Sequence, residues 1–172
     1  MKLDLHTHCF EATSFRAASV EIVGKIIDRI KARGLDGIAV TEHYDKTYGF
    51  QVKEIAEKHF PGQVIIIPGQ EINVWPVQIV ELYLADDVIF KFLAHPGYPG
   101  ELTPNVLVGL HGIEIENQLH NWHINKQKVR EVAEKYNLML LHDSDAHDLN
   151  DIGAAYNEIT VEELIKKAKG IV

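Results

Sequence analysis

Apolar strand segments and amphipathic helix segments alternate along nearly the whole sequence, and this alternation limits the fold more than any other feature. Residues 19–33 place their aliphatic side chains on one helical stripe between a capping Ser19 and Gly34. Residues 64–67 are aliphatic on both faces, which is typical of an inner strand of a parallel sheet. Repeated strand–helix–strand units of this kind build a parallel sheet, either open or closed.

The same pattern predicts the order of the elements. A strand at residues 71–74 is expected to form a hairpin with the strand that follows it, and residues 160–163 fit a capping box at the start of the last helix. The expected strands are residues 2–6, 35–40, 64–67, 71–74, 78–85, 90–94, 112–116, 138–141 and 155–159. The expected helices are residues 19–33, 50–59 and 125–136 and a last one from 160, with one helical turn at 103–108.

Histidine and acidic side chains come directly after the carboxyl ends of at least six of these strands. They are His8, His43, Glu71, His95, the loop of residues 117–120, and Asp145 with His147. In a closed barrel all these ends surround one mouth, whereas in an open sheet only the strands beside the switch point share a site. We therefore expect an α/β fold with a distorted or incomplete TIM-like β/α barrel, because 172 residues are few for eight full units. One domain, residues 1–172, is the simplest organisation for this length.

Composition narrows the class of protein. The formal net charge of −8 argues against nucleic acid or an anionic membrane as a general partner. A single cysteine excludes an intramolecular disulfide and suits a reducing compartment, so we expect a cytoplasmic protein. No stretch of the sequence approaches the length of a membrane span.

Two pairs of polar residues share the same spacing. His6 and His8 are two residues apart on a strand and so project from one face, and Asp145 and His147 repeat this spacing after another strand. Glu71, directly after an apolar strand, adds a carboxylate that can bridge two ions. Imidazole nitrogen together with carboxylate oxygen suits Zn, Mn or Fe better than Ca or Mg.

Other polar residues are better explained by structure. A single histidine after a strand more often packs or hydrogen-bonds than binds metal, and His59 sits late in a helix where it complements the dipole. Cys9 alternates away from the face of His8 and is expected to pack, while Asp143 is expected to contact a ligand rather than be one. The sequence has neither a Gly-x-Ser-x-Gly nucleophile elbow nor a phosphate-binding Gly-x-x-x-x-Gly-Lys loop.

Six short motifs occur in the order found in the PHP (polymerase and histidinol phosphatase) family, which the chain resembles from residue 1 to about residue 160. They are His6-Thr7-His8, Thr41-Glu42-His43, Gly69-Gln70-Glu71, Ala94-His95-Pro96, Gly112-Ile113-Glu114 and Ser144-Asp145-Ala146-His147. The resemblance implies a distorted seven-stranded β/α barrel that holds two or three divalent metal ions and usually acts as a phosphoesterase.

The resemblance also implies a set of metal ligands. A first ion would be held by His6, His8, Glu71 and Asp145, and a second by Glu71, His95 and a residue that we expect to be His120, with Asn117 and His111 as alternatives. A third would be held by His43 and His147, with Glu11 the nearest carboxylate to the family's remaining ligand. Glu42 replaces the aspartate that usually precedes His43, and this departure leaves two ions as the alternative to three.

The expected activity is hydrolysis of a small phosphate ester by a hydroxide that bridges the metal ions. His43, Glu71, Asp145 and His147 are the expected catalytic residues, and Arg16 is the expected substrate anchor. One alternative is an amidohydrolase-type hydrolase of C–N bonds, although such barrels typically carry a strand-end lysine that is missing from this sequence. A second alternative is a non-catalytic, metal-stabilised module.

Overall fold

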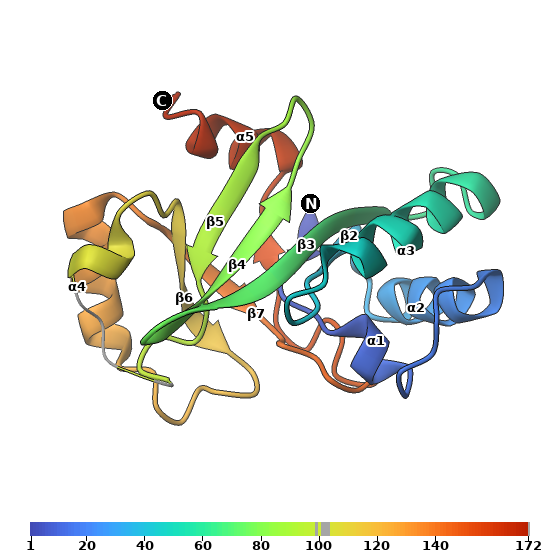
Figure 1. Cartoon of the computed structure of the whole chain (residues 1–172), viewed down its shortest axis with the longest axis horizontal. Coiled ribbons are helices and arrows are strands. Elements are labelled where there is room, and N and C mark those ends of the chain that lie inside the picture. The colour runs from blue at the N-terminus through green and yellow to red at the C-terminus, as the bar shows by residue number, and fades with distance from the viewer. Residues whose placement is uncertain (99, 101–103, 172) are drawn as a thin grey trace.

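The computed structural model describes residues 1–98, 100 and 104–171, and its strands form one strongly curved sheet (Figure 1). The order of the strands in the sheet is β7-β6-β5-β4-β3-β2-β1-β8. The strands are β1 (Lys2–Asp4), β2 (Gly37–Val40), β3 (Ile65–Val74), β4 (Val77–Tyr83), β5 (Ile89–Leu93), β6 (Gly112–Asn117), β7 (Met139–Asp143) and β8 (Asn157–Glu158). The helices are α1 (Cys9–Ala12), α2 (Val20–Ala32), α3 (Lys46–His59), α4 (Lys126–Tyr136) and α5 (Val161–Ala168), with a 3₁₀ turn η1 (Pro104–Leu107).

The sheet is mainly parallel, with the antiparallel β4 inserted between β3 and β5 and the antiparallel β8 at one edge. β1, β2 and β3 pair in parallel, as do β5, β6 and β7. β4 runs antiparallel to both β3 and β5, which confirms the predicted hairpin. Because a hairpin replaces a helical crossover at this point, the long β3 and β4 project beyond the neighbouring strands on one side of the molecule (Figure 1).

Hydrogen bonds beyond the ends of β1 and β7 nearly close the sheet. The amide of Asp145 donates to the carbonyl of His6, and the amide of His8 donates to the carbonyl of Ala146, both at 2.9 Å. The side chain of Asn157 strengthens this contact, because its Nδ2 donates to the carbonyl of His142 at 2.9 Å. The expected distorted β/α barrel is confirmed. The sheet has eight strands in the described part of the chain where the resemblance implied seven, and the two-residue β8, antiparallel to β1, lies within the strand predicted at residues 155–159.

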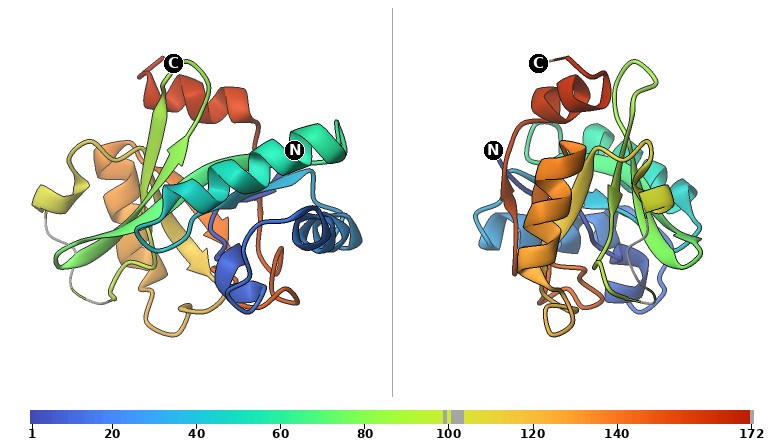
Figure 2. Two further views of the ribbon diagram at one scale, coloured as in Figure 1. Left: turned by 45° about the vertical axis from the view of Figure 1, so that its right-hand side comes forward. Right: turned by 90° about the vertical axis from the view of Figure 1, so that its left-hand side faces the viewer.

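The helices cover the outside of the sheet. α2 and α3 lie side by side next to β2 and β3, whereas α4 lies along β6 at the opposite side (Figures 1 and 2). The Ser19 hydroxyl accepts the amide of Ile22 at 3.3 Å, and Thr160 with Glu163 forms the predicted capping box. α3 begins four residues before the predicted residue 50, because Asp45 caps it by accepting the amide of Thr47 at 2.8 Å. No helix in the described part of the chain is long and apolar enough to cross a membrane.

The predicted helical turn at 103–108 is observed as η1, although residue 103 lies outside the described residues. The buried apolar side chains of the described residues form three clusters. One of these clusters includes the fully buried Leu3, Leu5, Phe90 and Phe92. The Phe92 ring meets His6 edge-on, with 6.3 Å between ring centroids, so the core directly supports the polar side chains at the barrel mouth.

Gly37 is a position where the parallel pairing of β2 and β3 excludes a side chain. A Cβ on Gly37 would lie 2.3 Å from the carbonyl oxygen of Ile65. We expect Gly37→Ala to lower the free energy of unfolding by about 1–3 kcal/mol, since the two strands must move apart. Urea denaturation measures this loss. The matched control is Gly24→Ala in α2, where the new Cβ would lie 3.4 Å from Phe60 Cζ and should not destabilise the helix. Equal free energies of unfolding for the two variants would contradict the close approach of β2 and β3.

Candidate metal centre

Four buried side chains from three parts of the sheet converge at the barrel mouth, and we name them the central cluster: His6, His8, Glu71 and Asp145. The Nε2 atoms of His6 and His8 are 3.1 Å apart. Asp145 Oδ1 lies 3.5 Å from His6 Nε2 and 3.2 Å from His8 Nε2. Glu71 Oε1 lies 3.6 Å from His6 Nε2, and Glu71 Oε2 lies 3.5 Å from His8 Nε2. Nitrogen and oxygen ligand atoms from four residues therefore face one small volume.

The local backbone orients the side chains of the central cluster. His6 and His8 follow β1 and project to the same side, as their two-residue spacing predicts. Asp145 has a left-handed backbone (φ 54°), an uncommon conformation for a residue with a side chain, and it turns the carboxylate toward His8. Its carboxylate also accepts a hydrogen bond from Asn117 Nδ2 at 3.1 Å.

A second group of histidines contacts the same two carboxylates, through the Glu71 Oε1 that also faces His6 and through the second oxygen of Asp145. Glu71 Oε1 lies 3.0 Å from His95 Nε2, and Asp145 Oδ2 lies 3.7 Å from His120 Nε2. Ligand atoms of His95, His120 and Asp145 all lie within 4.8 Å of one another. Glu71 and Asp145 therefore each face two groups of histidines.

Of the three residues considered for this second group, the structure brings His120 to it. Asn117 uses its Oδ1 to accept the amides of Leu119 and His120, at 3.1 and 3.0 Å, and so organises the loop that carries His120. His111 lies elsewhere, because its Nδ1 accepts the amide of Lys91 at 2.9 Å.

A third, more exposed group contains Glu11, His43 and His147 beside His8, with ligand atoms within 4.8 Å of one another. Glu11 carboxylate oxygens lie 3.9 Å from His43 Nε2 and 4.0 Å from His147 Nε2. The two imidazole rings stack on that of His8, with centroids 4.3 and 4.2 Å away. His43 also contacts Glu71 Oε2 through its Nδ1 at 3.0 Å. The structure thus brings together all nine side chains that were expected to hold metal.

The donor set of the central cluster fits a divalent cation. His6 Nδ1 lies 2.8 Å from Glu114 Oε1, so a proton on Nδ1 leaves the Nε2 lone pair of His6 facing the cluster. Burial lowers the pKa of His8 to about 4, so this imidazole is neutral and also offers a lone pair. Lone pairs and carboxylates that face one another repel unless positive charge is placed among them.

The carboxylates of the cluster are strongly held in the ionised form. Burial raises the pKa of Glu71, but the neighbouring His6, His43 and His95 outweigh it and keep this pKa well below the usual range. His6 and His8 likewise hold the pKa of Asp145 below its usual value in spite of burial. Burial lowers the pKa of His6, yet the carboxylates of Asp145, Glu71 and Glu114 raise it well above its usual value. The cluster therefore attracts positive charge, which a divalent cation supplies by displacing a proton.

Glu114 was not predicted as a site residue, and it is central to the arrangement. It is fully buried; one carboxylate oxygen contacts His6 Nδ1, and the other accepts the amide of His95 at 2.6 Å and Asn117 Nδ2 at 2.8 Å. The signal was present in the sequence, because Gly112, Glu114 and Glu116 alternate with Ile113 and Ile115 along β6. This alternation places Glu114 on the opposite face of β6 from Ile113 and Ile115.

Glu42 does not face the cluster. Its Oε1 accepts the amide of Phe10 at 2.9 Å, so the carboxylate satisfies a free N–H in the first turn of α1. Burial raises the pKa of Glu42 to about 7. Cys9 is fully buried, and burial raises the pKa of its thiol far above the usual range, which agrees with its expected packing role.

The groups border a cavity of about 240 Å³ that is open to solvent. Gln78, Tyr98 and Leu119 line it together with six side chains of the three groups, His43, Glu71, His95, His120, Asp145 and His147. Arg16 is not brought to this lining, since its guanidinium lies 3.8 Å from Glu21 at the start of α2, and both side chains are largely exposed.

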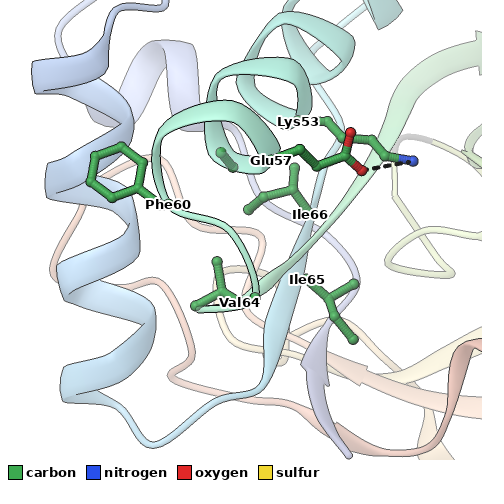
Figure 3. Close-up of a pocket in the computed structure, with 8 residues that line it drawn as sticks. Lys53, Glu57, Phe60, Val64, Ile65 and Ile66 are labelled. Atoms are coloured by element: carbon green, nitrogen blue, oxygen red, sulfur yellow. Dashed lines mark ion pairs between the residues drawn. The ribbon is translucent and has the colours of Figure 1, made fainter.

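Figure 3 shows another cavity, of about 200 Å³, between the end of α3 and the start of β3. Phe60, Val64, Ile65 and Ile66 line it, and its polar side is an ion pair of Lys53 with Glu57 at 3.8 Å (Figure 3). Its lining contains one carboxylate and no histidine. This cavity therefore lacks the set of side chains suited to metal chemistry.

Solved structures with the same fold come from several bacteria. PsfC from Pseudomonas syringae PB-5123 has a TM-score of 0.67 and 20% identity, with 95% of this chain and 87% of that chain covered. A proposed metal-dependent phosphoesterase from Bifidobacterium adolescentis ATCC 15703 has a TM-score of 0.73 and 12% identity, with 96% of each chain covered. An amidohydrolase from Chromobacterium violaceum, solved with bound sulfate and no metal, has a TM-score of 0.67 and 15% identity, with 97% of each chain covered.

The fold and the site define a distorted β/α barrel with a histidine- and carboxylate-rich mouth suited to divalent metal ions. The family model described as PHP-associated matches residues 123–172, which is less than half of the chain. No sequence of a curated protein matches the chain significantly.

Proposed function

We propose that this protein is a metal-dependent hydrolase that acts on small phosphate monoesters. The observation that carries the proposal is the position of Glu71, whose two carboxylate oxygens face different imidazoles: Oε1 lies 3.0 Å from His95 Nε2, and Oε2 lies 3.0 Å from His43 Nδ1. A carboxylate between separate groups of ligands is suited to bridging two cations. The three groups would hold two or three divalent ions, of which Zn, Mn and Fe suit these nitrogen and oxygen donors.

Divalent cations in such a site polarise a phosphoryl oxygen and bring the pKa of water toward neutrality, so no protein nucleophile is needed. The protein contributes a fixed frame around them. Glu114 orients His6 and the backbone of His95, and Asn117 fixes both Asp145 and the loop that carries His120. Preorganised ligands of this kind hold the reacting groups in place without further reorganisation.

His43 and His147 occupy the solvent side of the site, with exposed fractions of 37% and 32%. The hydrogen bond of His43 to Glu71 raises the pKa of His43, so this imidazole holds a proton more readily than a free one. In a two-ion form of the site, His43 or His147 is placed to give a proton to the leaving oxygen of the ester.

The cavity favours a small substrate. Its volume is about 240 Å³, and neither lysine nor arginine is among its lining residues in the described part of the chain. The phosphate would therefore be held by histidines and cations rather than by a cluster of basic side chains. Arg16 as a substrate anchor remains a prediction from the sequence alone.

A hydrolase of C–N bonds is the second candidate, and the likeness to the Chromobacterium violaceum amidohydrolase favours it. The strands in the described part of the chain end without the lysine that such barrels typically place between their metals. A non-catalytic metal-stabilised module is the third candidate, and the convergence of nine ligand-type side chains argues against it.

Metal removal and reloading test the proposal. Protein treated with a chelator should lose at least about 10²-fold in the rate of p-nitrophenyl phosphate hydrolysis, and Mn, Zn or Fe should restore it. A panel of phosphomonoesters, phosphodiesters and cyclic amides, assayed with the same metal-loaded protein, separates the candidates. Normal metal binding with no phosphate release would contradict phosphoesterase activity, and turnover of an amide alone would favour the second candidate.

A further inference from the structure

His123 is a second histidine in the turn that carries His120, and neither the family-type motifs nor the three ligand groups include it. Its Nε2 lies 3.0 Å from His120 Nδ1. The turn itself is well defined, because the amide of His123 donates to the carbonyl of His120 and the amide of His120 donates to that of Asn117. The two rings are therefore held as a hydrogen-bonded pair, with His120 Nε2 facing Asp145.

We propose that His123 is a positioning residue that accepts the Nδ1–H of His120 and so keeps the Nε2 lone pair of His120 available to a cation. This inference rests on the metal centre of the proposed function. In the hydrogen bond between two neutral imidazoles, one nitrogen donates and the other accepts. If His120 donates through Nδ1, its Nε2 is a lone pair directed at the site; if His123 donates instead, His120 Nε2 carries a proton and cannot bind metal.

The packing around His123 fixes this geometry from both neighbouring loops. The ring packs against those of Tyr98 and Trp122, with ring centroids 5.4 and 4.6 Å away. Gly97 approaches closely from the loop after β5, since a Cβ on Gly97 would lie 3.2 Å from the carbonyl oxygen of His123. The loop that carries His95 thus meets the loop that carries His120 at His123. A displacement of His123 would alter two ligands of the second group together.

Two substitutions separate hydrogen bonding from packing. His123→Phe keeps an aromatic ring in contact with Tyr98 and Trp122 but removes the acceptor, whereas His123→Gln restores an acceptor on a flexible side chain. His142→Phe is the matched control, because the ring of His142 contacts Glu116 outside the three ligand groups. All variants are made in the full chain, and circular dichroism and thermal unfolding of the metal-free proteins confirm that each is folded.

The first measurement is the affinity for Zn²⁺ by competition with a chelating dye. We expect His123→Phe to lower the affinity for the most affected Zn²⁺ ion by about 10–100-fold. This is the effect typical of removing the hydrogen-bond partner of a metal-bound histidine. His123→Gln should recover at least part of this loss, and His142→Phe should match the wild type. Equal affinities in the wild type and His123→Phe, or equal losses in the Phe and Gln variants, would overturn the proposal.

The second measurement is the ring tautomer of His120 by long-range ¹H–¹⁵N NMR of the Zn²⁺-loaded protein. The wild type should show the proton on Nδ1, and His123→Phe should lose this single state. A proton on Nε2 in the loaded wild type would overturn the proposal. Neither measurement needs a substrate. If His123→Phe lowers the Zn²⁺ affinity but the wild type hydrolyses no phosphate ester, only the proposed activity is contradicted. If the wild type hydrolyses phosphate esters but His123→Phe leaves the Zn²⁺ affinity unchanged, only the role of His123 is contradicted. A wild type that binds no divalent cation overturns both.

Discussion

Glu71→Gln is expected to lower phosphate ester hydrolysis by more than about 10²-fold while leaving the protein folded. Loss of the hydrogen-bond partner of a metal ligand lowers activity by up to about 10²-fold. A larger loss is expected at Glu71, because its own carboxylate faces four imidazoles, those of His6, His8, His43 and His95. The amide has nearly the same shape as the carboxylate, but it carries no charge and presents one oxygen instead of two. It can therefore neither balance two cations nor contact both groups of histidines through oxygen.

The measurement is kcat and KM for p-nitrophenyl phosphate, together with metal content and thermal unfolding. Glu81→Gln is the control, because Glu81 pairs with Lys91 at 2.7 Å on the neighbouring strands and lies outside the three ligand groups. A catalytic centre should lose turnover far more than it loses stability. A variant that binds metal and turns over like the wild type would show that Glu71 is not a bridging ligand, and equal losses of folding stability and metal would favour the non-catalytic module.

Phe92→Ala should cause the largest loss of folding stability, about 3–5 kcal/mol. The Phe92 side chain is fully buried in a cluster formed by several strands, so its removal leaves a cavity that these strands cannot easily close. Its edge-on contact with the ring of His6 links the core to the central cluster, and metal affinity should therefore fall as well.

Urea denaturation of the metal-free and metal-loaded forms measures both effects. Phe50→Ala provides the control, since Phe50 lies on α3 with an exposed fraction of 45% and its removal should cost much less. A loss below about 1 kcal/mol for Phe92→Ala would contradict its place in a tightly packed core.

Local patterns predicted most of the fold. The aliphatic stripe of residues 19–33 and the capping box at Thr160 were sufficient to place α2 and α5. The sequence predicted two strands, residues 64–67 and 71–74, where the structure has the single ten-residue β3. Gly69 and Gln70 join the two parts because they pair with Leu82 and Glu81 of β4. The strand predicted at 138–141 continues to Asp143, because His142 and Asp143 pair with Glu116 and Asn117 of β6.

Most side chains of the three ligand groups followed from the rule that strand ends meet at the mouth of a barrel, whereas Glu11 and the division into groups came from the resemblance to the PHP family. Glu114 and His123 were missed for a different reason: their importance lies in the groups they contact, and those contacts join residues on separate strands and loops. The local sequence does not indicate that the Glu42 carboxylate accepts a hydrogen bond from the amide of Phe10 and does not face the central cluster. The role of a residue that acts through such tertiary contacts can be identified only from the structure.

The closure of the barrel has a consequence for how the protein is made. The carboxylate of Asp4 accepts hydrogen bonds from Ser144, 140 residues away, and from the amide of Gly153, 149 residues away. A ribosome releases His6 and His8 among the first residues of this sequence and Asp145 near its end, so the central cluster is assembled only after most of the chain has been synthesised. Until then the early histidines lack their carboxylate partners, and strong metal binding becomes a property of the finished barrel rather than of the nascent chain.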